Sequence, residues 1–246
     1  MTERLEEVWG ARTVGDVVAE DYRRAAVFET HGIDFCCGGG RTVRAACEEA
    51  GADLDAVARA LSEAAEREAA QGATEPASWK LDVLADHIVA VHHGYVRASV
   101  PVLREFSAKV ARVHGDRHPE LLEIQGLVGE LSAELERHME DEEEILFPRI
   151  AALKSANRDG ARGEIRATTL ALEDDHARAA ELLGRIRALS GGFAAPADAC
   201  TTYRATYAKL AEFERDLHRH VHLENNVLFP RAAAMEEALG SSGTGA

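Results

Sequence analysis

The sequence lacks any window that approaches the roughly 18 apolar residues of a membrane-spanning helix. Its first residues, MTERLEEVWGARTVGDVV, contain no apolar core of the kind that a secretory signal carries. Cations are scarce too, because 28 lysines and arginines stand against 43 aspartates and glutamates, for a formal net charge of −15. Such a chain repels nucleic-acid phosphates and anionic lipids at long range. We therefore expect a cytoplasmic protein that binds neither nucleic acid nor membrane.

Cysteine is too scarce for a small disulfide-stapled scaffold. The chain has four cysteines, of which Cys36 and Cys37 are adjacent. Thiols in the cytosol are usually reduced, so we expect free cysteines rather than disulfides. Cys47 lies inside a helical pattern and Cys200 near the start of another, and we assign both to packing.

The adjacent cysteines lie in an unusual local sequence. Three glycines at positions 38–40 follow Cys36 and Cys37, and then Arg41 and Arg44 open a helical pattern. A helix N-terminus and nearby cations both stabilise a thiolate. Cys36 and Cys37 are therefore candidate reactive thiols. The alternative is that one or both pack beneath the turn as small apolar side chains.

Strand signals are absent, and the patterns indicate an all-α protein. Residues 1–72 predict a small helical domain that contains the Cys-Cys motif. The stretch QGATEPAS, residues 71–78, predicts a linker. Four long helical patterns follow, at about residues 79–113, 118–153, 164–189 and 200–239. We expect residues 79–237 to form a four-helix up-down bundle and residues 238–246 to form a disordered tail.

The predicted bundle contains an internal repeat. HMEDEEEILFPR begins at His138, and HVHLENNVLFPR begins at His220. In both copies a glutamate follows four residues later, at Glu142 and Glu224, and the two copies lie 82 positions apart without a slip.

A histidine also precedes each copy by nearly the same distance. His93 lies 45 residues before His138, and His176 lies 44 residues before His220. Antiparallel helices joined by a loop bring residues at such separations side by side. Six side chains then share the apolar faces of their helices. They are His93, His138, Glu142, His176, His220 and Glu224.

This set predicts a metal centre inside the bundle. An isolated carboxylate in an apolar interior costs several kcal/mol unless it is paired or binds a metal ion. The alternative is a set of solvated side chains at the helix edges. Two metal ions are favoured over one, because each glutamate can bridge and each ion keeps two imidazoles. Imidazole and carboxylate ligands suit iron or manganese, the number of histidines favours iron, and zinc fits the same ligands.

Other histidines lie close to this set. His92 and His93 are about 100° apart around a helix, so only one of them can face the core, and the apolar stripe favours His93. His218 and His222 fall off the apolar stripe of their helix. We expect these two side chains to face solvent or to support the metal ligands.

Two acidic residues repeat as well. Glu134 and Asp216 lie four residues before His138 and His220, again 82 positions apart. They are candidates for orienting those imidazoles or relaying protons. The alternative for each is an ordinary exposed pair on a helix surface.

Together these motifs resemble the iron–sulfur cluster repair di-iron family, also called the repair-of-iron-centres family. In that family a short cysteine domain precedes a hemerythrin-like bundle. The resemblance covers nearly the whole chain. It is carried by IDFCCGGG from Ile33, VHHG around His93, EDDH ending at His176, ACTTY from Ala199 and the two repeated segments.

The resemblance implies two non-haem iron ions with an oxo or hydroxo bridge. The four histidines of the set would hold them, Glu142 and Glu224 would bridge them, and Cys36 and Cys37 would be functional thiols. The implied role is cytoplasmic repair of iron–sulfur clusters damaged by nitric oxide or oxidants. The implied partners are damaged iron–sulfur proteins or a cluster-assembly scaffold, and small ligands such as nitric oxide, oxygen or peroxide. Oxygen-carrying hemerythrins use five histidines, so oxygen transport is disfavoured.

Three functional hypotheses follow from this reading. In the first, the protein supplies iron or performs redox chemistry during cluster repair. In the second, it is an enzyme that reduces nitric oxide or peroxide at the same centre. In the third, it is a sensor in which ligand binding at iron changes the contact between the cysteine domain and the bundle.

Overall fold

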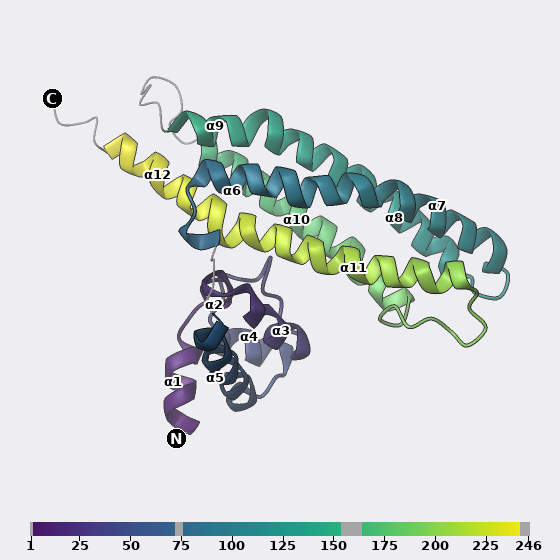
Figure 1. The fold of residues 1–246 in the computed structure, drawn as a ribbon, viewed down its shortest axis with the longest axis horizontal. Coiled ribbons are helices and arrows are strands. Elements are labelled where there is room, and N and C mark those ends of the chain that lie inside the picture. The colour runs from purple at the N-terminus through teal and green to yellow at the C-terminus, as the bar shows by residue number, and fades with distance from the viewer. Residues whose placement is uncertain (1, 72–75, 154–163, 242–246) are drawn as a thin grey trace.

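The structure is a computed structural model that describes residues 2–71, 76–153 and 164–241. All regular secondary structure in the described ranges is helical, and no strand forms there (Figure 1). An isolated antiparallel bridge between Thr13 and Thr42 is the nearest approach to one. None of the described helices has the length and apolar character needed to cross a membrane. The predicted all-α class is confirmed.

The N-terminal part is a cluster of short helices. They are α1 (Thr2–Gly10), α2 (Val14–Glu20), the 3₁₀ turn η1 (Tyr22–Arg24), α3 (Ala25–Thr30), α4 (Val43–Ala50) and α5 (Leu54–Gln71). Thr13 and Thr42 cap α2 and α4, because each hydroxyl accepts a hydrogen bond from a backbone N–H in the first turn. Val17, Phe28 and Leu61 are fully buried between these helices. The small domain therefore has an apolar core of its own.

The rest of the described chain is an up-down bundle (Figure 1). Its first rod comprises α6 (Leu81–His87), η3 (Ile88–His93) and α7 (Gly94–His114), and its second comprises α8 (Glu120–Asp141), η4 (Glu142–Leu146) and α9 (Phe147–Ala152). The third rod is α10 (Glu164–Leu189), and the fourth comprises α11 (Thr201–Leu223), η6 (Glu224–Leu228) and α12 (Phe229–Ser241). Helix α8 packs against both α7 and α10, and α11 packs against α7.

Three of the four rods contain a π-helical segment: η3, η4 and η6. A proline clashes with the carbonyl four residues earlier and donates no hydrogen bond to it. For Pro148 and Pro230 that carbonyl falls inside η4 and η6, where the wider π turn already breaks the α-helical bonding. The two rods therefore continue past their prolines as α9 and α12.

The observed elements differ from the predicted ones in places. Helix α10 has the predicted bounds, whereas α1 was not predicted. Residues 238–241 of the predicted tail belong to α12, and the remainder of the tail lies outside the described residues. Part of the predicted linker, residues 72–75, also lies outside them, and Pro76–Ser78 form a 3₁₀ turn.

The N-terminal helices dock onto the bundle through α2 and the loop of the adjacent cysteines. Asn226 of η6 donates hydrogen bonds to the carbonyls of Phe35, at 3.4 Å, and Cys36, at 3.0 Å. Its amide oxygen lies where side chains on Gly15 or Gly39 would collide with it, at 2.2 Å and 2.1 Å from an ideal Cβ. Two glycines therefore make room for a single bundle side chain.

We predict that Gly39→Ala weakens this docking. Its new Cβ must displace the Asn226 amide, and overpacking of this kind costs about 1–3 kcal/mol of unfolding free energy. Gly40→Ala is the matched control, because nothing lies within 4 Å of its ideal Cβ. Urea unfolding of the two variants measures the difference. Equal stabilities would show that the contact between Gly39 and Asn226 does not contribute to the docking.

His222 provides a second test of the docked surface. Its ring is 1% exposed and lies 5.8 Å from the ring of Tyr22 and 6.0 Å from that of Phe35. Burial lowers its pKa to about 4. The unfolded chain binds a proton at this residue near pH 6.5, whereas the folded chain does not until about pH 4. Stability is therefore fully present above pH 6.5 and falls as pH drops toward 4.

Because of His222, we expect the free energy of unfolding of the metal-free protein to fall by about 2 kcal/mol from pH 7 to pH 5. Denaturant unfolding at several pH values measures this loss. His222→Gln keeps a polar side chain but does not titrate, so its stability should lack this part of the pH dependence. Identical pH dependence in the two proteins would show that His222 is not held neutral by burial.

Candidate metal centre

The six predicted ligands converge in the middle of the bundle. All are at most 2% exposed: His93, His138, Glu142, His176, His220 and Glu224. Four rods supply them, and three of the six belong to the π-helical segments η3, η4 and η6. Inserted turns of this kind are frequent at functional sites, because they redirect a side chain without ending the helix.

The six side chains form two groups that share both glutamates. One group is His93, Glu142, His220 and Glu224, and the other is His138, Glu142, His176 and Glu224. Within each group one donor atom per residue lies within 4.8 Å of all the others. The arrangement therefore has two adjacent ligand sets with a pair of carboxylates between them.

Each carboxylate reaches an imidazole of both groups. Glu142 Oε2 lies 3.2 Å from His93 Nε2 and 3.4 Å from His138 Nε2. Glu224 Oε1 lies 2.8 Å from His220 Nε2, and its Oε2 lies 3.2 Å from His176 Nε2. This is the placement that bridging carboxylates require.

The nitrogen atoms of the imidazoles also face one another. His93 Nε2 lies 3.2 Å from His220 Nε2, and His138 Nε2 lies 2.9 Å from His176 Nε2. Only one nitrogen of each pair can carry the intervening proton. Both oxygens of Glu142 are buried without a hydrogen-bond partner among the described residues. Two cations would bind these imidazole nitrogens and carboxylate oxygens together, so the residues fit a metal site.

Electrostatics keep the two buried carboxylates charged. Burial and mutual repulsion raise the pKa of Glu142, but the imidazoles of His138 and His93 outweigh both effects and leave it below the usual value. Burial likewise opposes ionisation of Glu224, and three imidazoles hold its pKa well below the usual value. Two negative charges therefore persist in an interior with no exposed surface.

The facing histidines divide one proton between them. Burial alone would lower the pKa of His93, but Glu142 and Glu224 outweigh it and raise the pKa to about 10. Burial lowers the pKa of His220, which faces His93. Because metal ligands must be deprotonated, a metal ion displaces the shared proton when it binds.

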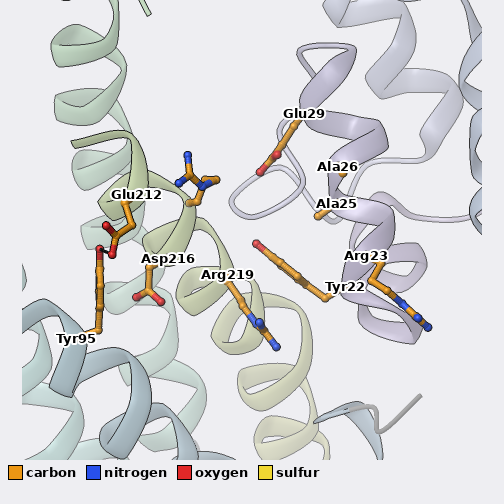
Figure 2. A pocket seen from close by; sticks show the side chains of 10 residues that line it. Tyr22, Arg23, Ala25, Ala26, Glu29, Tyr95, Glu212, Asp216 and Arg219 are labelled. Atoms are coloured by element: carbon orange, nitrogen blue, oxygen red, sulfur yellow. Dashed lines mark hydrogen bonds between the residues drawn. The ribbon is translucent and has the colours of Figure 1, made fainter. Parts of the chain in front are cut away.

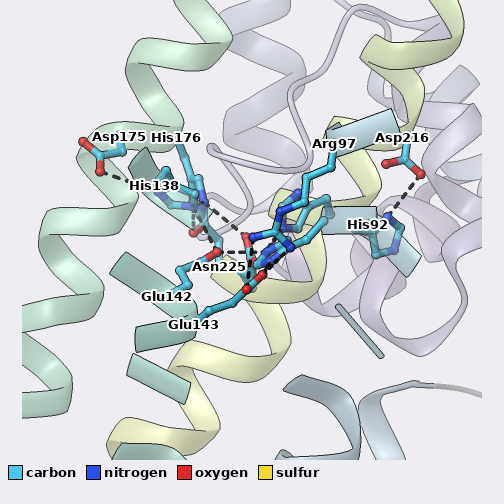
Figure 3. A network of polar contacts seen from close by, with 12 residues as sticks. His92, Arg97, His138, Glu142, Glu143, Asp175, His176, Asp216 and Asn225 are labelled. Carbon is cyan, nitrogen blue, oxygen red and sulfur yellow. Dashed lines mark hydrogen bonds and ion pairs between the residues drawn. The ribbon is translucent and has the colours of Figure 1, made fainter. Parts of the chain in front are cut away.

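Outer partners hold the rings in place (Figure 3). Asn225 Oδ1 lies 2.8 Å from His176 Nδ1 and accepts its hydrogen bond. Glu143 bonds His93 Nδ1 and is itself held by Arg97 at 3.0 Å. An acceptor at Nδ1 fixes the tautomer that leaves Nε2 free for a metal ion.

The structure places the predicted orienting carboxylates elsewhere. Glu134 pairs with Arg137 on the helix surface, and the acid nearest to the outer nitrogen of His138 is Asp175, at 3.5 Å. Asp216 bonds His92 at 3.1 Å instead of His220. A residue four positions earlier on a helix lies one turn away, but Glu134 turns to Arg137 of its own helix and Asp216 turns to His92 of another rod.

Both adjacent histidines are buried, which corrects the expectation for His92. His92 is 2% exposed, and its ring stacks on that of His220 at 5.5 Å with an interplanar angle of 5°. The π-helical segment η3 changes the angle between successive residues, so the α-helical spacing assumed from sequence does not apply. His222 is also buried rather than solvent-facing, because the N-terminal helices cover it, and His218 lies against Phe35 at 5.9 Å.

A cleft between the N-terminal helices and the bundle is lined in part by Asp216, the residue that bonds His92. It has a volume of about 410 Å³ and lies between η1 and α3 on one side and α11 on the other (Figure 2). Tyr22 and Arg219 face each other across it, with the guanidinium 4.9 Å from the ring centroid. Asp216 lines the same cleft. The wall of the cleft is therefore connected to the ligand set through Asp216, His92 and His220.

The two adjacent cysteines lie in different surroundings, and Cys36 matches the packing alternative. Cys36 is 6% exposed, and its contact with Cys37, its burial and the charge of Asp34 raise its pKa well above the usual value. The Arg41 guanidinium pairs with Glu49 and donates to the carbonyl of Gly38. Cys36 is therefore a buried neutral thiol, 3.9 Å from the partly exposed Cys37.

A second cavity joins the cysteine loop to the ligand set. It has a volume of about 500 Å³, and its walls include Cys37, Asp16, Glu173 and Asn225. Asn225 is the residue that holds His176. Burial raises the pKa of Glu173. The cavity thus has a thiol at one wall and an outer partner of the ligand set at another.

The remaining cysteines divide between two settings. Cys47 is buried in α4, as expected for a packing residue. Cys200 is exposed, and its Sγ lies 3.2 Å from His114 Nε2. The assignment of Cys200 to packing was wrong, because the residue caps the outer end of α11 and does not face inward.

The helices and the buried His and Glu residues together define a hemerythrin-like protein with an N-terminal cysteine domain. Residues 84–232 match the hemerythrin HHE cation binding domain, and residues 10–65 match a domain described as Domain of Unknown function (DUF542). The chain belongs to the family of the iron-sulfur cluster repair proteins YtfE and ScdA.

Two relatives illustrate the extent of the similarity. Iron-sulfur cluster repair protein YtfE of Enterobacter sp. (strain 638) is 36% identical over 228 residues, which cover 91% of this chain and 97% of the relative. Iron-sulfur cluster repair protein ScdA of Staphylococcus haemolyticus (strain JCSC1435) is 32% identical over 216 residues, which cover 88% and 95%. The similarity therefore includes both the cysteine domain and the bundle.

We predict that Asn225→Ala lowers metal affinity by about 10- to 100-fold, because the His176 ring loses the acceptor that orients it. Titration of ferrous ion against a chromophoric chelator measures the affinity. Glu134→Gln serves as the control, since Glu134 pairs with Arg137 and not with a ligand. Unchanged metal affinity in Asn225→Ala would show that Asn225 does not orient the His176 ring for metal binding.

Proposed function

We propose that the protein binds two non-haem iron ions and restores iron–sulfur clusters damaged by nitric oxide or oxidants. In this proposal His93 and His220 hold one ion, and His138 and His176 hold the other. Glu142 and Glu224 bridge them. The observation that carries the proposal is that each buried glutamate reaches one imidazole of each pair. The similarity to relatives named iron-sulfur cluster repair proteins supports the repair role.

Iron at this centre supplies one-electron redox chemistry and open coordination for a small ligand. The protein residues supply the rest. Two carboxylates that stay ionised balance the charge of the ions, while Asn225 and Glu143 fix the rings of His176 and His93. The apolar side chains around the set, such as Leu146 and Leu228 with no exposed surface, exclude water.

The thiols of Cys36 and Cys37 act in this proposal as the source of electrons or as the acceptor of released iron. Cys37 is the accessible member of the pair and lines the same cavity as Asn225. Carboxylates of Asp16 and Glu173 also line that cavity, so it attracts a cation. The cavity is therefore the path along which the thiols and the iron centre would communicate.

The partners in this proposal are damaged iron–sulfur proteins or a cluster-assembly scaffold in the cytoplasm. Nitric oxide, oxygen or peroxide are the small ligands. A formal net charge of −15 favours partners with a basic docking surface, because long-range attraction steers association of oppositely charged proteins.

A repair assay tests the proposal. A purified [4Fe–4S] dehydratase is inactivated with a nitric oxide donor and then incubated anaerobically with iron-loaded protein. We expect recovery of dehydratase activity with the natural sequence and less than about a tenth of that rate with Glu142→Ala/Glu224→Ala, because loss of ligand carboxylates removes the iron. Glu140→Ala is the matched control, since Glu140 is an exposed carboxylate two residues before Glu142.

Two outcomes discriminate between the functional hypotheses. Repair by the double variant at the full rate would overturn the proposal. Catalytic consumption of nitric oxide with an electron donor, but no dehydratase recovery, would instead favour the reductase. Cys36→Ser/Cys37→Ser should retain iron while repairing slowly, which separates the role of the thiols from that of the ligand set.

A further inference from the structure

A second cluster of chemically active side chains lies at the far end of the bundle. It is built from the C-terminal end of α7, the N-terminal end of α11 and the connecting residues next to them, at the end of the bundle opposite to α12 (Figure 1). Its members are His114, His118, Asp198, Cys200 and Tyr203. None of them takes part in the proposed iron centre.

The centre of this cluster is a thiol–imidazole pair. Cys200 Sγ lies 3.2 Å from His114 Nε2, and the two residues are 86 positions apart in the chain. Cys200 is exposed to solvent and caps α11 without a side-chain hydrogen bond to the helix backbone. The thiol is therefore accessible from outside and engaged with the imidazole.

Neighbouring residues hold the imidazole in position. The ring of Tyr203, which is 1% exposed, lies 5.4 Å from that of His114 and 5.7 Å from that of His118. His118 in turn lies 3.3 Å from the carboxylate of Asp198, two residues before the cysteine. The histidine next to the thiol thus rests against a buried aromatic ring.

Such a pair is the arrangement that activates a sulfur nucleophile. A thiol reacts as its thiolate, and an imidazole within hydrogen-bond reach can accept its proton. Among the other cysteines, Cys36 and Cys47 are buried, and Cys37 contacts a thiol rather than an imidazole. Cys200 alone combines an exposed thiol with an imidazole partner.

We propose that Cys200 and His114 form a thiol–disulfide exchange site whose substrate is a small anionic disulfide. His114 Nε2 accepts the thiol proton, and Cys200 Sγ attacks one sulfur of the disulfide. A new S–S bond forms at Cys200 as the old S–S bond breaks, and the departing thiolate takes the proton back from His114. The products are a mixed disulfide on the protein and one small thiol.

The charge of the surroundings selects the class of disulfide. Arg117 is 77% exposed and lies 3.8 Å from the Asp198 carboxylate, and Arg204 donates to the carbonyl of Ala197. Arg117 is paired with Asp198, so Arg204, which has no carboxylate partner among the described residues, is the guanidinium at this end of the bundle that can bind a carboxylate. A disulfide that carries carboxylates is favoured over one that carries amines.

Exchange kinetics at Cys200 test the proposal in the full-length protein. Glutathione disulfide serves as the anionic probe and cystamine as the cationic one, and peptide mass spectrometry follows each cysteine. A synthetic peptide of residues 196–208 contains Cys200 but not His114. We expect Cys200 in the folded protein to react with glutathione disulfide about tenfold faster than in the peptide, as general-base assistance requires. Buried Cys47 should stay unmodified.

Two variants assign the effect to the imidazole. His114→Gln should slow the reaction of Cys200 by about tenfold. Val113→Ala is the matched control and should leave the rate within about twofold, because Val113 is the exposed neighbour of His114 on α7 and does not belong to the cluster. Circular dichroism checks that both variants fold. If His114→Gln does not fold, the comparison of the folded natural sequence with the peptide tests the proposal.

The proposal is overturned if Cys200 in the folded protein reacts no faster than in the peptide, or if His114→Gln reacts at the full rate. A larger acceleration over the peptide with cystamine than with glutathione disulfide would overturn the assignment to anionic disulfides. Iron content should be the same in all of these proteins, so failure here is distinguishable from failure of the proposed repair function.

Discussion

The structure depends on two ionised carboxylates held in an apolar interior. Glu142 and Glu224 have no exposed surface, and their negative charges repel each other. Moving such charges out of water costs several kcal/mol each unless positive charge meets them. Four imidazoles face the carboxylates, and they can supply either protons or metal coordination. The bundle is therefore built around two buried negative charges that protons on the imidazoles or metal ions must balance.

This constraint explains the irregular parts of the helices. A regular α-helix would present its side chains at fixed angles, whereas η3, η4 and η6 redirect them at the positions of His93, Glu142 and Glu224. Segment η6 also contains the consecutive residues Asn225 and Asn226, which bond to different parts of the protein. Asn225 bonds the ring of His176, and Asn226 bonds the backbone of the cysteine loop. Neighbouring residues thus connect the ligand set to the thiol domain.

Much of this arrangement follows from the sequence, because it rests on local periodicity. The all-α class, the bounds of α10 and the convergence of the six His and Glu residues all follow from repeated motifs on apolar faces. Contacts between distant segments did not follow. His92 bonds a residue 124 positions away, and His222 is covered by the N-terminal helices. The π-helical angle at His92 and the exposed setting of Cys200 have no signal in a helical pattern.

The central claim is that two cations, rather than protons alone, complete the buried ligand set. The most direct measurement is the number of ferrous ions bound per chain at saturation under anaerobic conditions, followed by calorimetry. The account predicts two ions bound with proton release, because the facing imidazoles give up their shared protons to the metal. Binding of a single ion, or of none, to a correctly folded chain would contradict it.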